Sequence, residues 1–463
     1  MQKTRRAPLM SVAAVLGAMA ASLAAHAGDE CVPGFIPDIG PIGPDSGLAG
    51  GVAYHDDGNG PEVYVGGSFT TIGGVAAPRI VKVARDKAGT LEFTPLGTGL
   101  SNAECYALAS FQGSLYAAGY FDLAGGVPGT AKLARWDGSA WNSIGAQLEL
   151  FSNQLWGLTV WNSGQGDNLY IAGNFQNIGG TSASYIARYD GKAFHALGTT
   201  PIAGNVPLII FTSHVHDDGT GPALYVGGRF TSIDGVAASR IARWNGTSWS
   251  AVGSGVTGSG VSPSINTMVT FDDGTGPALY VGGQTFVTAG GVPANRVAKW
   301  DGKNWSAVGD GFANGIVWKL AVYNDGTGDA LYAFGTFTAS GATPINRMAK
   351  WNGTSWEQWG GGANGTVFNA LVIEGGGGDG ADLLALGGQF TTIGTDTRNR
   401  IAAFEGCPEV VSVPGDLDGD GVVNGADLSI LLSAWGSADP TADIDGDGSV
   451  GAADLSVLLG NWG

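Results

Sequence analysis

One sequence pattern recurs seven times along this chain, and it limits the possible folds more than any other feature. The clearest copy, LYVGGRFTSIDGVAASRIARWNGTSWSAVGSG, runs from Leu224 to Gly255. Measured at one equivalent position, successive copies are 52, 54, 55, 55, 52 and 53 residues apart; these positions are Tyr64, Tyr116, Tyr170, Tyr225, Tyr280, Tyr332 and Ala385. Repeats of this length are typical of propellers and solenoids, in which each repeat forms one supersecondary unit.

Each copy contains four short segments with strand character. The fifth begins with Ile265–Phe271 and a DDGTG turn, followed by segments of the LYVGG, RVAKW and NWSAVG type. Asn245-Gly246 and Asp301-Gly302 join the third and fourth segments and are strong hairpin signals. With 81 glycines the chain is also unsuited to a mostly helical fold. The sequence therefore predicts a mainly β protein with a seven-bladed β-propeller of four-stranded blades over residues 28–407.

The glycine pair after the second segment and the tryptophans that follow it resemble the blades of kelch-type propellers. The resemblance covers about residues 31–407. It implies the propeller fold and no particular activity.

Closure of the predicted ring involves both ends of the propeller. The seventh copy stops at Phe404-Glu405-Gly406 without a fourth strand, and a short strand, Phe35–Gly40, precedes the first copy. We expect this strand to complete the last blade. Cys31 and Cys407 flank the closure, so we predict a disulfide between them, with two unpaired buried thiols as the alternative. Cys105 is expected to be a buried apolar filler.

The first 27 residues have the pattern of a secretory signal peptide. Lys3, Arg5 and Arg6 precede an apolar run that ends at Ala25-His26-Ala27. An N-terminal membrane anchor is the weaker alternative because small alanines dominate the run. No later stretch approaches about 20 apolar residues. We predict a secreted or cell-surface protein that follows Sec-type export and has no membrane span in the mature chain.

Basic residues of the propeller recur in the third strand of each copy. We expect them to serve the architecture by pairing with carboxylates such as Asp137, Asp190 and Asp301. The alternative is a basic ring that faces an anionic glycan. These residues are Arg79, Lys82, Lys132, Arg135, Arg188, Arg240, Arg243, Arg296, Lys299, Arg347, Lys350 and Arg400. The net charge of −18 argues against nucleic acid as a partner.

Catalytic residues are not recognisable in the propeller. His214 and His216 alternate on one strand beside Asp217 and Asp218, which could indicate a metal site, but Phe271 occupies the His216 position in the fifth copy. A strand end is therefore the preferred interpretation, and the DDGTG turns are interpreted as hairpin loops. No carboxylate pair of the kind that glycoside hydrolysis requires is unique to one copy.

The C-terminal segment is acidic and contains its own repeat. From Ile401 to the end there are 11 acidic residues and no Lys or Arg. Two segments, GDLDGDGVVNGADLSILLSAWG and ADIDGDGSVGAADLSVLLGNWG, are offset by 27 residues. Their oxygen-bearing positions have the spacing of calcium loops, so we predict two calcium ions. The predicted ligands are Asp416, Asp418, Asp420, the Val422 carbonyl, Asn424 and Asp427, and then Asp443, Asp445, Asp447, the Ser449 carbonyl and Asp454.

Each predicted loop leads into a short helix. The apolar residues Leu428, Leu431, Leu432 and Trp435 have helical spacing, and Leu455, Leu458, Leu459 and Trp462 repeat it. Two loop-plus-exit-helix units of this kind resemble type I dockerins, over about residues 415–463 after a linker at 408–414. The resemblance implies calcium-dependent attachment to a cohesin-like or other surface scaffold protein, in either of two orientations because the halves are nearly identical.

The likeness to dockerins has one departure. Family members often carry a hydroxyl-bearing recognition pair where this chain has Gly425-Ala426 and Ala452-Ala453. The sequence as a whole indicates an exported non-catalytic binding protein whose propeller presents a glycan- or protein-binding face. The alternatives are a dockerin-tethered enzyme of the glycoside hydrolase type and a tail that acts only as a sorting tag.

Overall fold

The computed structural model contains two compact units, one that includes Pro33–Gly406 and one that includes Cys407–Gly463. The residues it describes are 34–35, 49–58, 60–85, 91–149, 154–200, 202–204, 208–258, 260, 262–373, 382–407, 414–418 and 422–462. The predicted signal peptide lies outside them. No helix in this part of the chain is long and apolar enough to cross a membrane.

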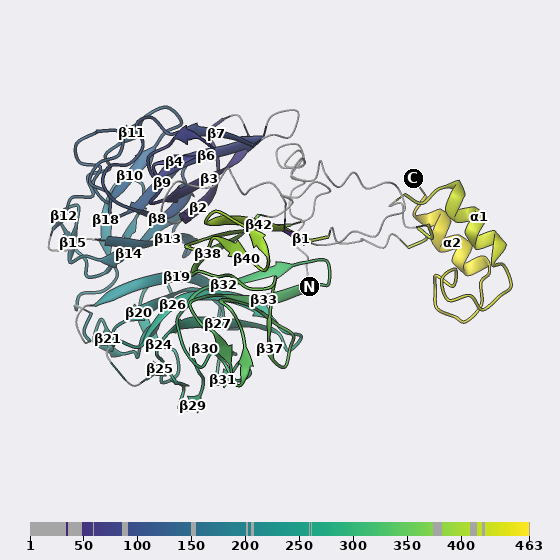
Figure 1. The fold of residues 1–463 in the computed structure, drawn as a ribbon. Helices are drawn as coiled ribbons and strands as arrows, with labels where there is room; N and C mark the ends of the chain where they lie inside the picture. The colour runs from purple at the N-terminus through teal and green to yellow at the C-terminus, as the bar shows by residue number, and fades with distance from the viewer. Residues whose placement is uncertain are drawn as a thin grey trace. The chain divides into compact units, whose positions relative to one another are not determined.

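Seven antiparallel sheets of four strands form the first unit in the described part of the chain (Figure 1). The inner strands are β2 (Ala49–Asp56), β8 (Cys105–Phe111), β13 (Gln154–Asn162), β19 (Ile209–Asp217), β26 (Ser264–Asp272), β32 (Val317–Asn324) and β38 (Val367–Ile373). The second strands are β3 (Pro61–Gly67), β9 (Ser114–Gly119), β14 (Asp167–Asn174), β20 (Pro222–Arg229), β27 (Pro277–Gln284), β33 (Asp329–Gly335) and β39 (Leu383–Gly388).

Six of the seven third strands contain a basic residue, but half of the basic residues predicted for them lie one position before the strand: Arg79, Lys132, Arg240, Arg296, Arg347 and Arg400. The third strands are β6 (Ile80–Arg85), β10 (Leu133–Trp136), β17 (Ile186–Tyr189), β23 (Ile241–Trp244), β30 (Val297–Trp300), β36 (Met348–Trp351) and β42 (Ile401–Glu405). The outer strands are β7 (Leu91–Pro95), β11 (Trp141–Asn142), β18 (Phe194–Ala196), β24 (Trp249–Ala251), β31 (Trp305–Ala307), β37 (Trp356–Gln358) and β1 (Gly34–Phe35). The seven repeat markers of the sequence all lie in second strands, which confirms the mainly β fold and its repeat unit.

The inner strands close a ring. Each packs on the next in chain order from β2 to β38, and β38 packs on β2. The last sheet takes its outer strand from the N-terminal end, since Gly34 pairs with Glu405 and Phe35 with Phe404. The predicted closure is therefore present with a shorter strand than expected, and residues 36–40 of the predicted strand lie outside the described ones.

The cysteines are placed as follows. Cys105 is a free, fully buried thiol, and burial raises its pKa to about 12, which agrees with a filler. Cys407 lies two residues after the end of β42 and is not a free thiol. Because Cys31 lies outside the described residues, the Cys31–Cys407 pair stays a prediction.

The second glycine of the LYVGG segment, present at this position in all seven repeats, has a steric cause. Leu224, Tyr225 and Val226 of β20 are fully buried because sheets cover both faces of the strand. At Gly228 a Cβ atom would collide with the carbonyl oxygen of Ile209 on the inner strand. The collision point lies where the inner strand has one extra residue, between Ile210 and Thr212. Glycine therefore permits a β-bulge in the inner strand of this sheet.

Short hairpins between the second and third strands are features that we did not predict. They are β4 (Thr71–Ile72) with β5 (Val75–Ala76), β15 (Asn177–Ile178) with β16 (Thr181–Ser182), β21 (Ser232–Ile233) with β22 (Val236–Ala237), β28 (Thr288–Ala289) with β29 (Val292–Pro293), β34 (Ala339–Ser340) with β35 (Thr343–Pro344), and β40 (Thr392–Ile393) with β41 (Asp396–Thr397). Two further strands, β12 (Leu148–Glu149) and β25 (Val256–Thr257), pair with β15 and β28.

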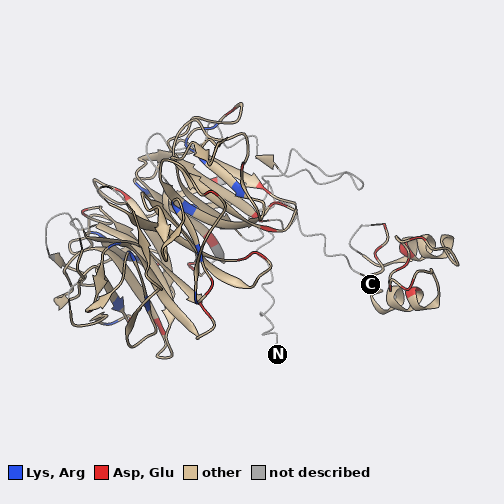
Figure 2. Cartoon of the chain, turned by 90° about the horizontal axis from the view of Figure 1, so that it is seen from below, with Lys and Arg blue, Asp and Glu red and all other residues tan. Residues whose placement is uncertain are grey.

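The basic residues of the third strands serve the architecture, as expected, but the predicted acidic partners were wrong. Figure 2 shows basic segments on several strands of this unit. Asp137 accepts hydrogen bonds from the backbone of Ser139 and Ala140 in its own hairpin, and Asp190 and Asp301 accept equivalent bonds in theirs. The ion pairs instead join Lys82, Arg243, Lys299 and Lys350 to Asp57, Asp218, Asp273 and Asp325, at 3.3, 3.4, 2.6 and 2.6 Å. These four carboxylates belong to the turns after the inner strands, which lie beside the third strands.

One of these pairs yields a stability prediction. The buried Asp325 carboxylate accepts from Lys350 at 2.6 Å and from the Tyr332 hydroxyl at 2.9 Å. Asp325→Ala should therefore lower the free energy of unfolding by about 3 kcal/mol, because both donors lose their acceptor inside the sheet. Asp329→Ala, at an exposed position of β33, should change it by less than about 0.5 kcal/mol. Calorimetric unfolding of both variants measures the difference.

The same contact predicts a pH dependence. Burial alone raises the pKa of Asp325, but hydrogen bonds from Lys350, Thr327 and Tyr332 outweigh it and lower the pKa below the ordinary 3.8. The stabilisation is complete above that ordinary value and is lost as the pH falls through the lowered pKa. Asp325→Ala should thus lose less stability than the natural chain on acidification below pH 3.8. A steeper acid loss in the variant would contradict this assignment.

The second unit contains two helices, α1 (Gly425–Ser433) and α2 (Ala452–Gly460). Its small core consists of Val423, Leu431, Ala442, Val450 and Leu458. Figure 2 shows acidic and no basic segments on the described part of this unit.

Candidate metal centre

The first acidic loop brings together three of its predicted ligands. One carboxylate oxygen each from Asp416, Asp418 and Asp427 lies within 4.8 Å of the other two. Asp420 lies outside the described residues. Three carboxylates at this separation repel one another unless a cation lies between them, and hard cations such as calcium prefer oxygen ligands. The donor set of this loop therefore fits calcium.

The second loop assembles a different subset of its predicted ligands. Oxygens of Asp443, Asp445 and Asp447 lie within 4.8 Å of one another. Asp443 also accepts from the backbone N–H groups of Asp447 at 3.1 Å and Gly448 at 2.8 Å. Gly448 has a φ of +92°, which a residue with a side chain rarely adopts. The loop thus folds back on its first aspartate, and both acidic groups could hold ions.

The twelfth loop residues hold each loop to its helix. Asp427 is fully buried, and its carboxylate accepts from the backbone of Leu417 at 2.7 Å, Asp418 at 3.1 Å and Asn424 at 2.8 Å. Burial raises its pKa, but these three bonds outweigh burial and leave the pKa below its ordinary value. Asp454 is its counterpart and accepts from Ile444 at 2.7 Å, Asp445 at 3.1 Å and Gly451 at 2.7 Å.

Some of the predicted calcium ligands do not contribute an oxygen to either of these two acidic groups. The Asn424 side-chain oxygen accepts from the backbone of Ala426 at 2.8 Å and so caps α1, and its amide donates to the Val422 carbonyl at 3.0 Å. Ser449 donates from its backbone and its hydroxyl to Asp447, at 2.8 and 2.9 Å. Their roles as ligands stay predictions, as does that of Asp454, which is outside the second group.

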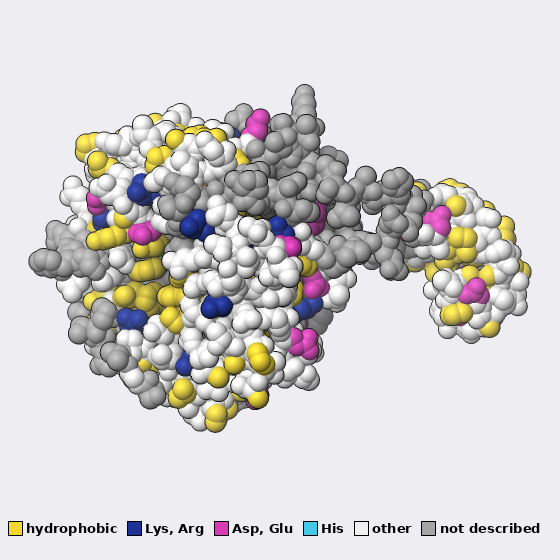
Figure 3. Space-filling model, in the orientation of Figure 1, with side chains coloured by type: hydrophobic (Ala, Val, Ile, Leu, Met, Phe, Trp, Pro, Cys, Tyr) yellow, Lys and Arg dark blue, Asp and Glu magenta, His cyan; other side chains and the backbone are white. Residues whose placement is uncertain are grey.

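Besides Val422, four large apolar side chains in the described part of this unit are exposed, which the sequence interpretation missed. Leu432 and Leu459 are each 53% exposed, and Trp435 and Trp462 are 46% and 47% exposed. The helical spacing suggested that they share a buried face with Leu431 and Leu458, but only those two are buried. The exposed residues form two Leu–Trp pairs related by the 27-residue offset, and Figure 3 shows hydrophobic side chains on this surface.

Neither His214 nor His216 belongs to a metal-type group among the described residues. His214 and His216 both hydrogen-bond to the Thr270 hydroxyl at 2.9 Å. Burial lowers the pKa of His214 to about 4, with smaller effects of His216 and Lys319. The DDGTG turns are hairpin loops, as predicted: Asp272 accepts from the backbone of Gly274 and Gly276 at 2.9 Å.

Comparison with known proteins identifies the two units separately. Residues 414–460 match the dockerin type I domain, and residues 165–191 match DUF5122, a β-propeller domain of unknown function. No curated protein matches the chain.

Two solved structures of the extracellular domain of BT4673 from B. thetaiotaomicron are similar to the chain, at 12% and 13% identity with TM-scores of 0.45 and 0.43. They cover 80% and 77% of this chain, which spans only 39% and 38% of theirs. The family matches, together with the ring of four-stranded sheets and the two-helix unit described above, lead to one conclusion: the chain combines a β-propeller with a C-terminal type I dockerin domain.

Proposed function

We propose that this protein is an exported binding protein whose dockerin attaches the propeller to an extracellular or cell-surface assembly in a calcium-dependent manner. The observation that carries the proposal is the dockerin domain with its two acidic groups. Asp416, Asp418, Asp420, Val422, Asn424 and Asp427 would hold one calcium ion, and Asp443, Asp445, Asp447, Ser449 and Asp454 the other. Calcium would neutralise carboxylates that otherwise repel one another, and so keep both loops folded.

The partner of the dockerin is proposed to be a cohesin-type module. Gly425-Ala426 and Ala452-Ala453, at the usual recognition positions, are exposed but offer neither hydroxyl nor bulk. The exposed Leu–Trp pairs offer large apolar contacts instead, and tryptophan is among the residues that contribute most at interfaces. Because the pairs are related by the internal repeat, each would present an equivalent docking face.

A binding role for the propeller agrees with its chemistry better than hydrolysis does. Glycoside hydrolysis uses two carboxyl groups on either side of the scissile bond. A cavity lined by the inner strands in the described part of the propeller has one carboxylate, Glu104, among its lining residues. Assays for reducing sugar released by the full chain from plant and algal glycans test the enzyme alternative directly.

The docking proposal is tested with the full chain and a panel of immobilised cohesin modules, in calcium and in EGTA. We expect binding in calcium only. The Asp416→Ala/Asp443→Ala variant should fail to bind in either buffer, because each loop loses its first ligand. Asp439→Ala is the matched control: Asp439 is an exposed aspartate of the same unit outside both acidic groups.

A further inference from the structure

The inner strands of all seven sheets line a cavity of about 500 Å³. It lies toward the ends at which these strands begin, where every inner strand has a β-bulge. A bulge turns the extra side chain away from the regular alternation of the strand. The cavity volume falls in the range of about 300–1,000 Å³ that is common for small-molecule sites.

Five of the seven bulges carry an aromatic residue that lines this cavity. We call this set the aromatic collar; it consists of Tyr106, Trp156, Phe211, Trp318 and Phe368. The other two bulges carry Asn266 and the glycines Gly50-Gly51. All five collar residues are half-buried, and none belongs to the hydrophobic clusters between the sheets. Their exposed faces are therefore available to a ligand.

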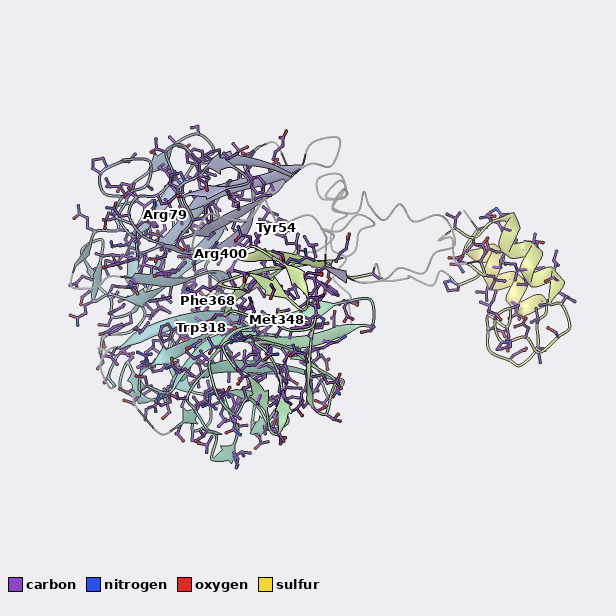
Figure 4. The ribbon with its side chains drawn as sticks, in the orientation of Figure 1. Tyr54, Arg79, Trp318, Met348, Phe368 and Arg400 are labelled. Carbon is purple, nitrogen blue, oxygen red and sulfur yellow. The ribbon has the colours of Figure 1, made fainter. Side chains whose placement is uncertain are left out.

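The collar has two separate arcs. Tyr106 and Trp156 stack at 4.3 Å between ring centroids with planes 8° apart, and Phe211 meets Trp156 edge-on at 5.5 Å. On the other arc, Trp318 and Phe368 lie 5.7 Å apart, and both are labelled in Figure 4 on neighbouring inner strands. The polar Asn266 separates the arcs on one side and the small Gly50-Gly51 on the other.

Three polar donors of the lining residues have no acceptor among the described residues. The indole N–H groups of Trp156 and Trp318 and the side-chain amide N of Asn266 are buried, and none has a hydrogen-bond partner among the described residues. Buried donors normally have an acceptor, because an unpaired one costs about 1–3 kcal/mol. These three N–H groups have almost no solvent-accessible surface, so they lie behind the cavity wall and do not themselves indicate a ligand.

Lys319 adds a positive charge to these donors. It follows Trp318 on β32 and lines the cavity, and its ammonium makes no ion pair or hydrogen bond with the described residues. Burial lowers its pKa. The single carboxylate of the lining, Glu104, accepts from the Tyr106 hydroxyl at 3.3 Å instead. His214 is uncharged at neutral pH because its pKa is about 4. Burial disfavours the ammonium and no described residue pairs with it, so an anionic ligand group would stabilise the charged form of Lys319.

We propose that this cavity binds an anionic saccharide, with sugar rings against the aromatic collar and the acidic group on Lys319. The exposed aromatic faces fit the apolar C–H face of a sugar ring. The acidic group would be a carboxylate or a sulfate. This inference rests on the proposed binding function and names its ligand class.

Calorimetric titration of the full chain with three trisaccharides tests the proposal. The probes are a trigalacturonate, a sulfated galactan trisaccharide and neutral maltotriose. We expect at least one acidic probe to bind at least tenfold more tightly than maltotriose. Whether the trigalacturonate or the sulfated trisaccharide binds shows whether the cavity recognises a carboxylate or a sulfate. Lys319→Met should reduce this preference to less than threefold. Trp318→Ala should weaken binding of the same probe at least tenfold.

The control is Lys192→Met, which removes an exposed lysine charge and should leave binding unchanged. Lys319→Met should melt at the same or a higher temperature than the natural chain, because it removes an unpaired buried charge. A lower melting temperature together with unchanged acidic-probe binding would show a structural role and overturn the proposal. So would equal binding of neutral and acidic probes, or no binding of either. Calcium-dependent docking does not involve the cavity, so failure here leaves the dockerin role intact and separately measurable.

Discussion

Replacing both Asp427 and Asp454 by alanine should unfold the dockerin while the propeller stays folded. Each carboxylate accepts three backbone N–H groups from its own loop, and both residues are fully buried. The change leaves six backbone donors without their acceptor and removes an acidic residue from each predicted calcium loop. A core of five buried residues cannot offset such losses.

Hydrogen–deuterium exchange of the full chain measures this effect, because it reports each unit separately. Peptides from 422–462 should exchange at least a hundredfold faster in the double variant, even in calcium. Peptides from the propeller strands should be unchanged. Asp439→Ala is again the control and should keep the natural protection. Equal protection of α1 and α2 in the double variant and the natural chain would show that these carboxylates do not hold the unit together.

Removing both exposed tryptophans should abolish docking without unfolding the dockerin. Trp435 and Trp462 lie outside the core and are about half exposed, so Trp435→Ser/Trp462→Ser should leave calcium binding intact. If each Leu–Trp pair forms one of two equivalent docking faces, either single variant keeps one face and should lose only about half of its apparent affinity. The double variant should lose about thirtyfold to a thousandfold, since a buried interface tryptophan typically contributes about 2–4 kcal/mol.

The singles and the double must therefore be compared in the same binding assay. Leu428→Ala provides a contrast because Leu428 packs against the core of the unit; it should weaken the fold and docking together. A hundredfold loss in one single variant would show that only one face docks. Unchanged docking in the double variant would exclude the Leu–Trp pairs as the contact surface.

Local signals account for the parts of the fold that the sequence predicted. Turn residues such as Asn245-Gly246 mark hairpins within a few positions, and the period of the repeat shows how many times the unit recurs. Ring closure was also predictable, because the last copy ends one strand short and a strand-like segment precedes the first copy. The ion pairs of the third strands could not be predicted. Asp325 and Lys350, for example, are far apart in the sequence, and the folding of the sheet brings them together.

The cavity could not be predicted for a related reason. Its collar residues occupy bulges, and a bulge is a property of register between two strands that hydrophobic alternation does not show. The collar positions also differ from copy to copy, from Trp156 to Asn266, so the repeat gave no signal for them. Lys319 was the basic residue to notice, because it lies in an inner strand outside the repeated basic position.

The calcium loops show the opposite case. Ligand spacing is set within twelve residues, so Asp416, Asp418 and Asp427 could be grouped from the sequence alone. The exposure of the Leu–Trp pairs could not be predicted, because helical spacing shows which residues share a helix face but not how much of that face other residues cover. Two helices of nine residues bury only Leu431 and Leu458 fully along that face.

The affinity of the full chain for a cohesin-type module, measured against free calcium concentration, tests the central claim most directly. We predict tight binding at millimolar calcium, at least a thousandfold loss in EGTA, and full recovery when calcium is restored. Asp416→Ala/Asp443→Ala should show no calcium response at any concentration. Equal binding with and without calcium, or an unchanged response in that variant, would contradict a calcium-dependent tether.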